Sequence, residues 1–419
     1  MFTFCDTKLE LKGENKMKKS RLLVFSIGTV FAIVACNSGN NKNVTFTLHD
    51  PENTSQCTEN CQNYVDAMRE QQNEIEDDYK MNTLFGNQGV DIANYADPNN
   101  GPYSDVNTGV ELTFEVEEKN PCDCIPTVKV SRNEDMSDPE TYSGVNSVTV
   151  KNLYANTKYY WQVEQGNEKS EVKEFTTGDY PRWIDCKPLF NVRDCGGYMT
   201  SSGQRVKQGL VYRGAEIANN EFSRSGERHI QTVTEESKKV FRDVMKIGVE
   251  IDLRNSGENE NGAYTACGFA EDGDIDYHMW GIGSYANYIK EPKNCSDIFD
   301  TLANADEKPV YFHCYGGADR TGTIAFLLNA ILGVSYTDLV IDFELTSYSS
   351  IITRECKRSH LREGQWDHWP ALESELKKQT TWDANDSLKD NVERYLVQKA
   401  GVKQTTIDKI RSIMLESAE

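Results

Sequence analysis

The stretch from Pro309 to Gly322 places the tightest constraint on how this chain can fold. A short apolar run ends in His313 and Cys314, a glycine-bearing loop follows, and Thr321 opens a second apolar run that is long enough for a helix. The pattern predicts a strand, a tight loop and a helix in that order. Backbone N–H groups in such a loop converge on one point, where the helix N-terminus adds partial positive charge. We therefore expect a site for a phosphate dianion at this turn.

The side chains of this loop suit nucleophilic chemistry at phosphorus. The field that attracts a phosphate also favours a thiolate, so we expect Cys314 to have a lowered pKa and to be nucleophilic near neutral pH. Arg320 lies six residues further on and can hold two phosphate oxygens at once, which a lysine cannot do. A cysteine and an arginine at this spacing are a weak signal alone. The adjoining His313, the glycines and Thr321 make the signal specific.

These residues resemble the phosphate-binding loop of the cysteine-dependent tyrosine phosphatases. The loop is most similar to a bacterial branch that reads His-Cys-x-Ala-Gly-Lys-Asp-Arg-Thr-Gly. Residues 191–198 and 211–214 are similar to the Asn-Phe-Arg-Asp-Leu-Gly-Gly and Tyr-Arg-Ser-Gly motifs of that branch, and residues 251–254 resemble its Ile-Asp-Leu-Arg strand end. The resemblance covers about residues 185–417. It implies a phosphomonoester hydrolase that forms a phosphocysteine intermediate and needs no metal or cofactor.

The resemblance also assigns roles within the loop. It makes Cys314 the nucleophile, Arg320 the phosphate ligand and Asp319 the acid that protonates the leaving oxygen. A loop-stabilising ion pair is the alternative role for Asp319. The remaining residues of the phosphate-binding loop are His313, Tyr315, Gly316, Gly317, Ala318, Thr321 and Gly322. His313 is expected to hold loop backbone by hydrogen bonds and not to act as a base.

Many members of the superfamily carry the acid on a separate loop ahead of the cysteine. Here the equivalent stretch, residues 277–284, has no carboxylate, which favours Asp319. Asp194 is the second candidate for the acid. Residues 366–370 look like such an acid loop, but they follow Cys314, and we interpret the likeness as misleading.

The motif match also selects four candidate substrate contacts, of which Arg193 is the best: Arg193, Asp194, Arg213 and Arg254. Phosphotyrosine protein is the leading substrate, because a deep pocket around one cysteine suits an aryl phosphate. A small phosphate ester, inositol phosphate or phosphoinositide is the second substrate class, although Ala318 replaces the lysine that the branch links with highly phosphorylated lipids. The same residues would also fit a non-catalytic protein that binds phosphorylated ligands, or a redox sensor in which Cys195 pairs reversibly with Cys314.

The N-terminal residues predict export and anchoring. Basic residues from Met17 precede the apolar run Leu22–Val34, which is too short to span a bilayer, and Ala35-Cys36 follow. Residues 33–36 resemble a lipobox, which implies that Cys36 is lipidated and anchors an exported protein in a membrane. An ordinary signal peptide is the alternative. Residues 1–16 do not fit such a signal, so Met17 is the expected start.

The net charge and the cysteines narrow the partners. A formal net charge of −21 argues against a nucleic-acid partner, because phosphate backbones need a basic surface. Some of the twelve cysteines should form disulfides in an exported protein, although the sequence does not show which cysteines pair. The oligomeric state is not readable either.

We expect four parts in the chain. They are a signal region at 1–36, a tether with a solvated helix at 37–87, an all-β sandwich at 88–178 and an α/β catalytic domain at 182–419. In the third part, alternating polar and apolar residues predict strands near 110–116, 127–130, 147–150, 159–163 and 172–176.

Two features characterise the third and fourth parts. Residues 152–161 resemble the Leu-x-Pro-x-Thr-x-Tyr stretch of fibronectin type III domains. Beyond residue 182, helices alternate with strands, which predicts a parallel-rich central sheet flanked by helices. Ser296 and Ser335 are the expected caps of two of these helices.

Overall fold

A computed structural model describes most of the 419-residue chain: residues 44–70, 107–119, 124–187, 189–217, 221–224, 227–230, 234–255, 275–349 and 368–417. The chain divides between residues 38 and 39, and all of the described residues belong to the second unit, Gly39–Glu419. Cys36 and the rest of the signal region lie outside the described residues. Within those residues, no helix combines the length and the apolar character that a membrane crossing needs.

The N-terminal part of the described chain forms antiparallel sheets. The first sheet has the order β1-β2-β5, with β1 at Val44–Leu48, β2 at Val110–Glu118 and β5 at Ser147–Val150. The second sheet contains β4 (Glu140–Ser143), β3 (Thr127–Ser131), β6 (Lys158–Gln165), β7 (Glu168–Lys169) and β8 (Lys173–Thr176). Apolar residues of both sheets share one hydrophobic cluster around the fully buried Trp161.

All five strands expected from alternation are present as β2, β3, β5, β6 and β8. β1 lies outside the expected range of 88–178. It pairs with β2, which comes much later in the sequence. β4 and β7 were not expected. Each is too short and too polar to show an alternating pattern in the sequence.

The helix expected to be solvated is instead half buried. α1 (Glu59–Glu70) turns one face into the hydrophobic core that it shares with the C-terminal helices, and that face carries Cys61, Tyr64, Val65 and Met68. Arg69 Nε donates to Asp338 Oδ1 at 3.1 Å on α8 (Tyr336–Glu344). A segment that lies between β1 and β2 of the first antiparallel sheet is therefore part of the C-terminal body.

A mixed five-stranded sheet forms the centre of the C-terminal body, in the order β15-β14-β16-β11-β9. Its strands are β15 (Asp276–Met279), β14 (Val249–Asp252), β16 (Val310–His313), β11 (Val211–Gly214) and β9 (Arg193–Asp194). The first four strands are parallel, and β9 runs antiparallel to β11. The predicted parallel-rich sheet is thus correct except at the β9 edge.

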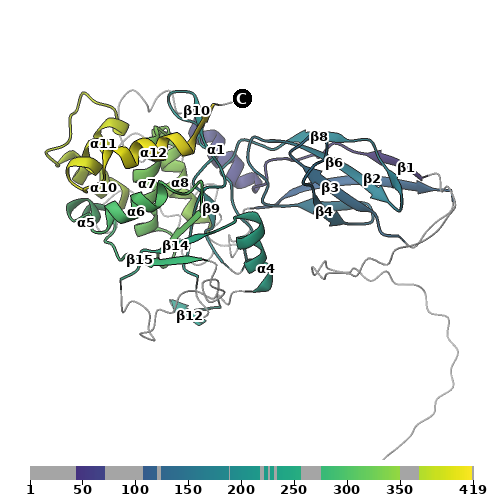
Figure 1. Cartoon of the computed structure of the whole chain (residues 1–419), viewed down its shortest axis with the longest axis horizontal. Helices are drawn as coiled ribbons and strands as arrows, with labels where there is room; N and C mark the ends of the chain where they lie inside the picture. The colour runs from purple at the N-terminus through teal and green to yellow at the C-terminus, as the bar shows by residue number, and fades with distance from the viewer. Residues whose placement is uncertain are drawn as a thin grey trace, which may run out of the picture. The chain divides into compact units, whose positions relative to one another are not determined.

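Helices cover both faces of this sheet (Figure 1). Tyr212 and Tyr311 pack on one face against Phe241, which follows α4 (Glu235–Lys239) in the π-helical turn η2 (Val240–Val244). Val310 and Phe312 face the opposite side, with the larger group of helices. This group comprises α5 (Tyr285–Lys290), α6 (Cys295–Leu302), α7 (Asp319–Leu332), α8, α10 (His368–Lys377), α11 (Leu388–Gln398) and α12 (Gln404–Met414).

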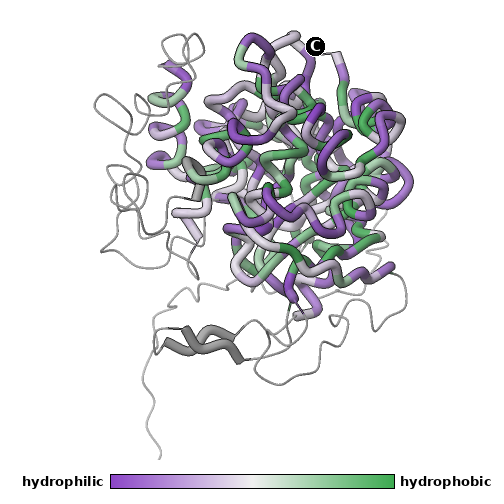
Figure 2. The backbone as a smooth tube through the Cα atoms, turned by 90° about the vertical axis from the view of Figure 1, so that its left-hand side faces the viewer, coloured by the Kyte–Doolittle hydropathy of each residue, from purple (hydrophilic) through white to green (hydrophobic). Residues whose placement is uncertain are grey.

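Hydrophobic segments run through the inside of this body, and hydrophilic ones lie toward its outside (Figure 2). α7 is deeply enclosed, with every residue from Thr321 to Leu332 buried. Ser335 caps α8 as expected, by accepting a hydrogen bond from the Asp338 N–H at 3.1 Å. The expected cap at Ser296 is wrong, because α6 begins one residue earlier, after Asn294.

Candidate active site

The predicted strand, loop and helix are β16, residues 314–318 and α7. The parallel strands end at one edge of the sheet, and Cys314 follows β16 at that edge. Gly317 adopts a φ of +68°, and a side chain there would place its Cβ 2.4 Å from the carbonyl carbon of Gly214 at the end of β11. The loop therefore packs against the end of a neighbouring strand so closely that only glycine fits.

Cys314 lies at the base of the loop with only 3% of its surface exposed. Burial by itself raises the pKa of the thiol, but the charge of Arg320 and the hydroxyl and N–H groups of Thr321 hold the pKa below its usual value. Thr321 is fully buried, and its hydroxyl is one of the groups that lower the thiol pKa. The loop favours the thiolate that a nucleophile needs.

His313 is fully buried and contacts the loop backbone, as expected. Its Nδ1 lies 3.0 Å from the carbonyl oxygen of Cys314, and its Nε2 lies 2.9 Å from Oε1 of Glu250 on β14. Burial lowers the pKa of His313, but the charge of Asp252 and the hydrogen bond to Glu250 outweigh it and raise the pKa above its usual value. A protonated imidazole donates from both nitrogens and cannot act as a base.

This raised pKa predicts how the stability of the protein depends on pH. A group whose folded-state pKa is raised adds stability below its unfolded pKa of about 6.5, and the gain disappears as pH rises through the folded pKa. The gain is about 1.4 kcal/mol for each unit by which the pKa is raised. Thermal unfolding of wild type and Glu250→Gln should therefore differ most near pH 5 and least near pH 9. A difference in thermal stability between wild type and Glu250→Gln that stays constant from pH 5 to pH 9 would contradict a pair between protonated His313 and Glu250.

Two expected substrate contacts, Arg193 and Arg213, are buried beneath the loop. Both pair with Asp342 of α8, and Arg213 also donates to the carbonyl oxygen of Gly317 at 2.7 Å. Arg193 donates to Asn191, whose side chain donates in turn to the carbonyl oxygen of Gly316 at 3.0 Å.

The placement of these arginines changes their expected role. Burial and the neighbouring Arg213 lower the pKa of Arg193 to about 10, while Asp342 opposes the shift. Neither guanidinium has solvent-exposed surface from which to meet a ligand. This geometry does not fit the expectation that Arg193 and Arg213 contact substrate. It fits a role for both residues in supporting the phosphate-binding loop.

Asp194 and Arg254, the remaining two expected contacts, are also enclosed. Asp194 accepts from Arg182 at 2.8 Å and from the N–H groups of Gly196 and Gly209, and only 1% of its surface is exposed. Burial raises the pKa of Asp194 in spite of Arg182. Such a side chain ties loop backbone together and does not reach a leaving group.

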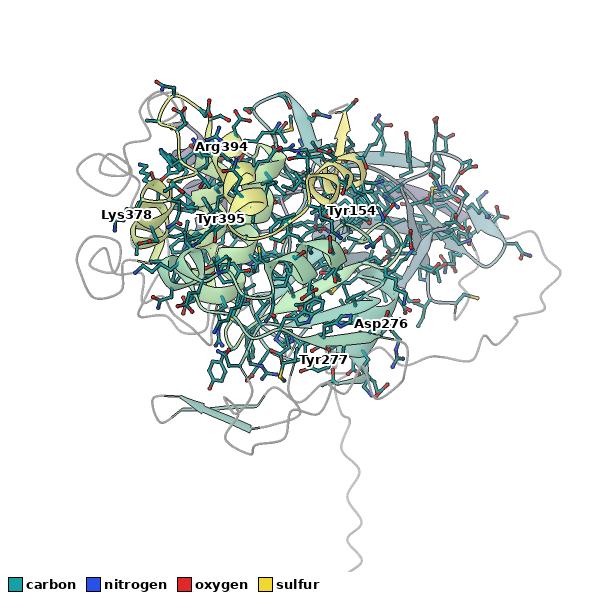
Figure 3. All side chains as sticks on the ribbon, turned by 60° about the vertical axis from the view of Figure 1, so that its left-hand side comes forward. Tyr154, Asp276, Tyr277, Lys378, Arg394 and Tyr395 are labelled. Carbon is teal, nitrogen blue, oxygen red and sulfur yellow. The ribbon has the colours of Figure 1, made fainter. Side chains whose placement is uncertain are left out.

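Arg254 belongs to a charged cluster at the ends of β14 and β15. Its Nη2 donates to Asp252 at 2.6 Å and its Nη1 donates to Glu216, while the Tyr277 hydroxyl donates to Asp252 at 2.9 Å. Figure 3 shows Tyr277 beside Asp276 on β15. Asp252 and Glu250 in turn raise the pKa of His313. We therefore assign Arg254 to the support of the strand ends.

Asp319 and Arg320 form the first turn of α7, immediately after the loop. Oδ1 of Asp319 accepts a hydrogen bond from the Tyr285 hydroxyl at 2.8 Å. Arg320 lies close enough to Cys314 for its charge to lower the thiol pKa. Tyr315 uses its carbonyl oxygen to accept from the Glu216 N–H at 3.1 Å. Of the stretch 366–370, with its acid-loop likeness, residues 366–367 lie outside the described residues and residues 368–370 begin α10.

Six of the described cysteines are free thiols: Cys57, Cys61, Cys186, Cys195, Cys295 and Cys314. None of the expected disulfides joins these six. Cys195 packs in the same hydrophobic cluster as Cys314, and its burial raises the pKa of its thiol well above the usual value. A buried, protonated thiol of this kind fits packing better than redox chemistry.

The described residues also include no group of three or more His, Cys, Asp or Glu side chains placed to hold a metal ion.

Three supporting residues were missed from the sequence: Glu250, Asp342 and Tyr285. Glu250 and Asp342 each interrupt an apolar run, in a strand and a helix respectively. A charge in such a run is almost never buried without a partner, and this is the signal that could have found both. Tyr285 carries no comparable signal, because its contact with Asp319 joins two separate helices.

The cysteine is buried, its thiol pKa is lowered, and it lies between a parallel strand and a helix whose first turn carries an aspartate and an arginine. This arrangement defines a cysteine-dependent phosphatase. The sequence model of the tyrosine phosphatase family matches residues 184–416, more than half of the chain, and the chain belongs to this family. A search of the curated proteins finds no match. Among solved structures, the chain is similar to the core catalytic domain of the PP-IP phosphatase SIW14 from S. cerevisiae in complex with citrate. That match is 14% identical, covers 40% of this chain and 88% of the matched chain, and has a TM-score of 0.25.

Proposed function

We propose that the protein hydrolyses phosphomonoesters by two displacements at phosphorus. Cys314 attacks, an S–P bond forms and the ester O–P bond breaks, while Asp319 gives its proton to the leaving oxygen. Water then attacks the phosphocysteine, Asp319 takes a proton from it, and the S–P bond breaks to release phosphate. Arg320 and the loop backbone hold the phosphoryl oxygens throughout. The lowered pKa of Cys314 beside Arg320 is the observation that carries this assignment.

Phosphotyrosine in a protein is the substrate class that we favour. Cys314 is buried at the bottom of its loop, so a long, flat aryl phosphate can reach it more readily than a bulky sugar phosphate. Ala318 is also buried and brings no positive charge to the loop, which disfavours polyphosphorylated rings. An inositol phosphate or phosphoinositide remains the second candidate, and a non-catalytic binding protein the third.

We further propose that the enzyme acts outside the cytoplasm, anchored through a lipid on Cys36, with a fibronectin type III-like sandwich ahead of the catalytic domain. The support for the sandwich is the shared core of the two antiparallel sheets together with one hydrogen bond. The hydroxyl of Tyr159 accepts from the N–H of Tyr154 at 2.9 Å, so that a strand tyrosine fastens the preceding loop as in related sandwiches. This module would act as a spacer or docking element.

The test is turnover by residues 37–419 under reducing conditions with EDTA present. p-Nitrophenyl phosphate and a phosphotyrosine peptide should both be hydrolysed, and Cys314→Ser should lower the rate by at least about 10³-fold. Inositol phosphates assayed in parallel distinguish the two substrate classes. If the reduced wild-type protein binds vanadate but turns over none of these substrates, the enzyme assignment fails and the binding protein is favoured.

A further inference from the structure

The stretch that carries the acid in many related phosphatases ends here in a tyrosine. Residues 280–284 follow β15 and lead into α5, whose first residue is Tyr285. Tyr285 is buried, with 4% of its surface exposed, and has a φ of +49°. A large aromatic residue rarely adopts this left-handed conformation, and such strain persists only where neighbouring contacts hold it.

Those contacts lead to the first turn of α7. The Tyr285 hydroxyl donates to Oδ1 of Asp319 at 2.8 Å. The Tyr285 N–H donates to Oγ1 of Thr323 at 2.9 Å, and that hydroxyl donates onward to the carbonyl oxygen of Asp319 at 2.9 Å. The ring meets Phe343 edge to face, with 6.1 Å between the centroids. One residue thus holds both the backbone and the carboxyl group of Asp319.

We propose that Tyr285 is the positioning residue of the general acid, an inference that rests on the proposed function. Because Oδ1 is occupied by the Tyr285 hydroxyl, the acidic proton of Asp319 is directed to Oδ2, which turns to the leaving oxygen. When that proton has been transferred, the same hydrogen bond stabilises the carboxylate that activates water. The separate acid loop of related enzymes has been replaced by a side chain that orients an acid within the phosphate-binding loop.

The backbone and hydroxyl contacts of Tyr285 can be separated experimentally. Tyr285→Phe keeps the ring on Phe343 and the N–H bond to Thr323, so the fold should survive, and the hydroxyl bond to Asp319 is lost. Tyr288→Phe is the matched control. Tyr288 lies one turn further along α5, is fully buried, and has its hydroxyl beside Cys295, away from the loop.

The experiment compares wild type, Tyr285→Phe, Tyr288→Phe and Asp319→Asn on two substrates. For a phosphotyrosine peptide, whose leaving oxygen needs a proton, kcat/KM should fall about 10-fold in Tyr285→Phe, the scale of one hydrogen bond to a charged group. For p-nitrophenyl phosphate, whose leaving group departs more easily as an anion, the fall should be smaller. The inhibition constant of vanadate should not change, since the phosphate site is intact. Tyr288→Phe should match wild type on all three measurements.

Three results would overturn the inference. In the first, Tyr285→Phe behaves as Tyr288→Phe does while Asp319→Asn is slow, which leaves the proposed function standing without the tyrosine. In the second, Tyr285→Phe loses the same factor on both substrates and binds vanadate more weakly, which is the signature of a structural defect. If Asp319→Asn is as fast as wild type although Cys314→Ser is inactive, the acid assignment in the proposed function falls, and this inference falls with it.

Discussion

Asp342→Ala is expected to lower the free energy of unfolding by about 3–5 kcal/mol and to weaken vanadate binding at the phosphate loop. Asp342 is the carboxylate that balances Arg193 and Arg213, and neither arginine has appreciable exposed surface. Burial raises the pKa of Asp342, but the two guanidinium groups outweigh this effect and hold it below its usual value. Removing the carboxylate leaves two buried positive charges side by side, and Arg213 then no longer holds the carbonyl oxygen of Gly317 in place.

The measurements are chemical denaturation and vanadate inhibition, with Asp338→Ala as the control. Asp338 lies one turn earlier on α8 and pairs with the partly exposed Arg69 of α1. Asp338→Ala should lose stability but keep the wild-type affinity for vanadate. Equal vanadate affinity in Asp342→Ala and Asp338→Ala would show that Asp342 does not support the loop.

Tyr64→Ala is expected to destabilise the catalytic body by about 3 kcal/mol, although Tyr64 lies more than a hundred residues ahead of the region matched by the family. Tyr64 is 1% exposed on α1 and packs in the same hydrophobic cluster as Val340 and Leu339 of α8. Truncation leaves a cavity beneath the helix that carries Asp342. A fragment that begins at residue 182 would lack α1 altogether and expose this surface.

Thermal unfolding followed by loss of phosphatase activity measures this effect. Asn63→Ala, on the exposed face of the same helix, is the matched control and should unfold as wild type does. If Tyr64→Ala also unfolds as wild type does, α1 is not part of the catalytic core and the fragment from residue 182 should fold alone.

Features determined by neighbouring residues were predictable from the sequence. The strand, loop and helix around Cys314 depend on a local apolar run, glycines and a helix start, and all three appear where the sequence places them. The five strands expected from alternation are present for the same reason, since a half-buried strand shows its period in its own residues. α7 begins at Asp319, two residues before the Thr321 start that the apolar run predicted, so Arg320 lies in its first turn and not in the loop.

Only the tertiary structure decided which charges meet. Arg193, Arg213 and Asp342 come from three separate elements, and nothing in the spacing of the arginines distinguishes support of the loop from contact with a substrate. The polar spacing of α1 looked solvated because its partner surface, on α8, lies some 270 residues away in the chain. Tyr285 meets Asp319 because α5 and α7 pack together, and such packing has no period or motif in the sequence. The sequence by itself thus predicted the candidate reacting groups, and the fold determined how they are held.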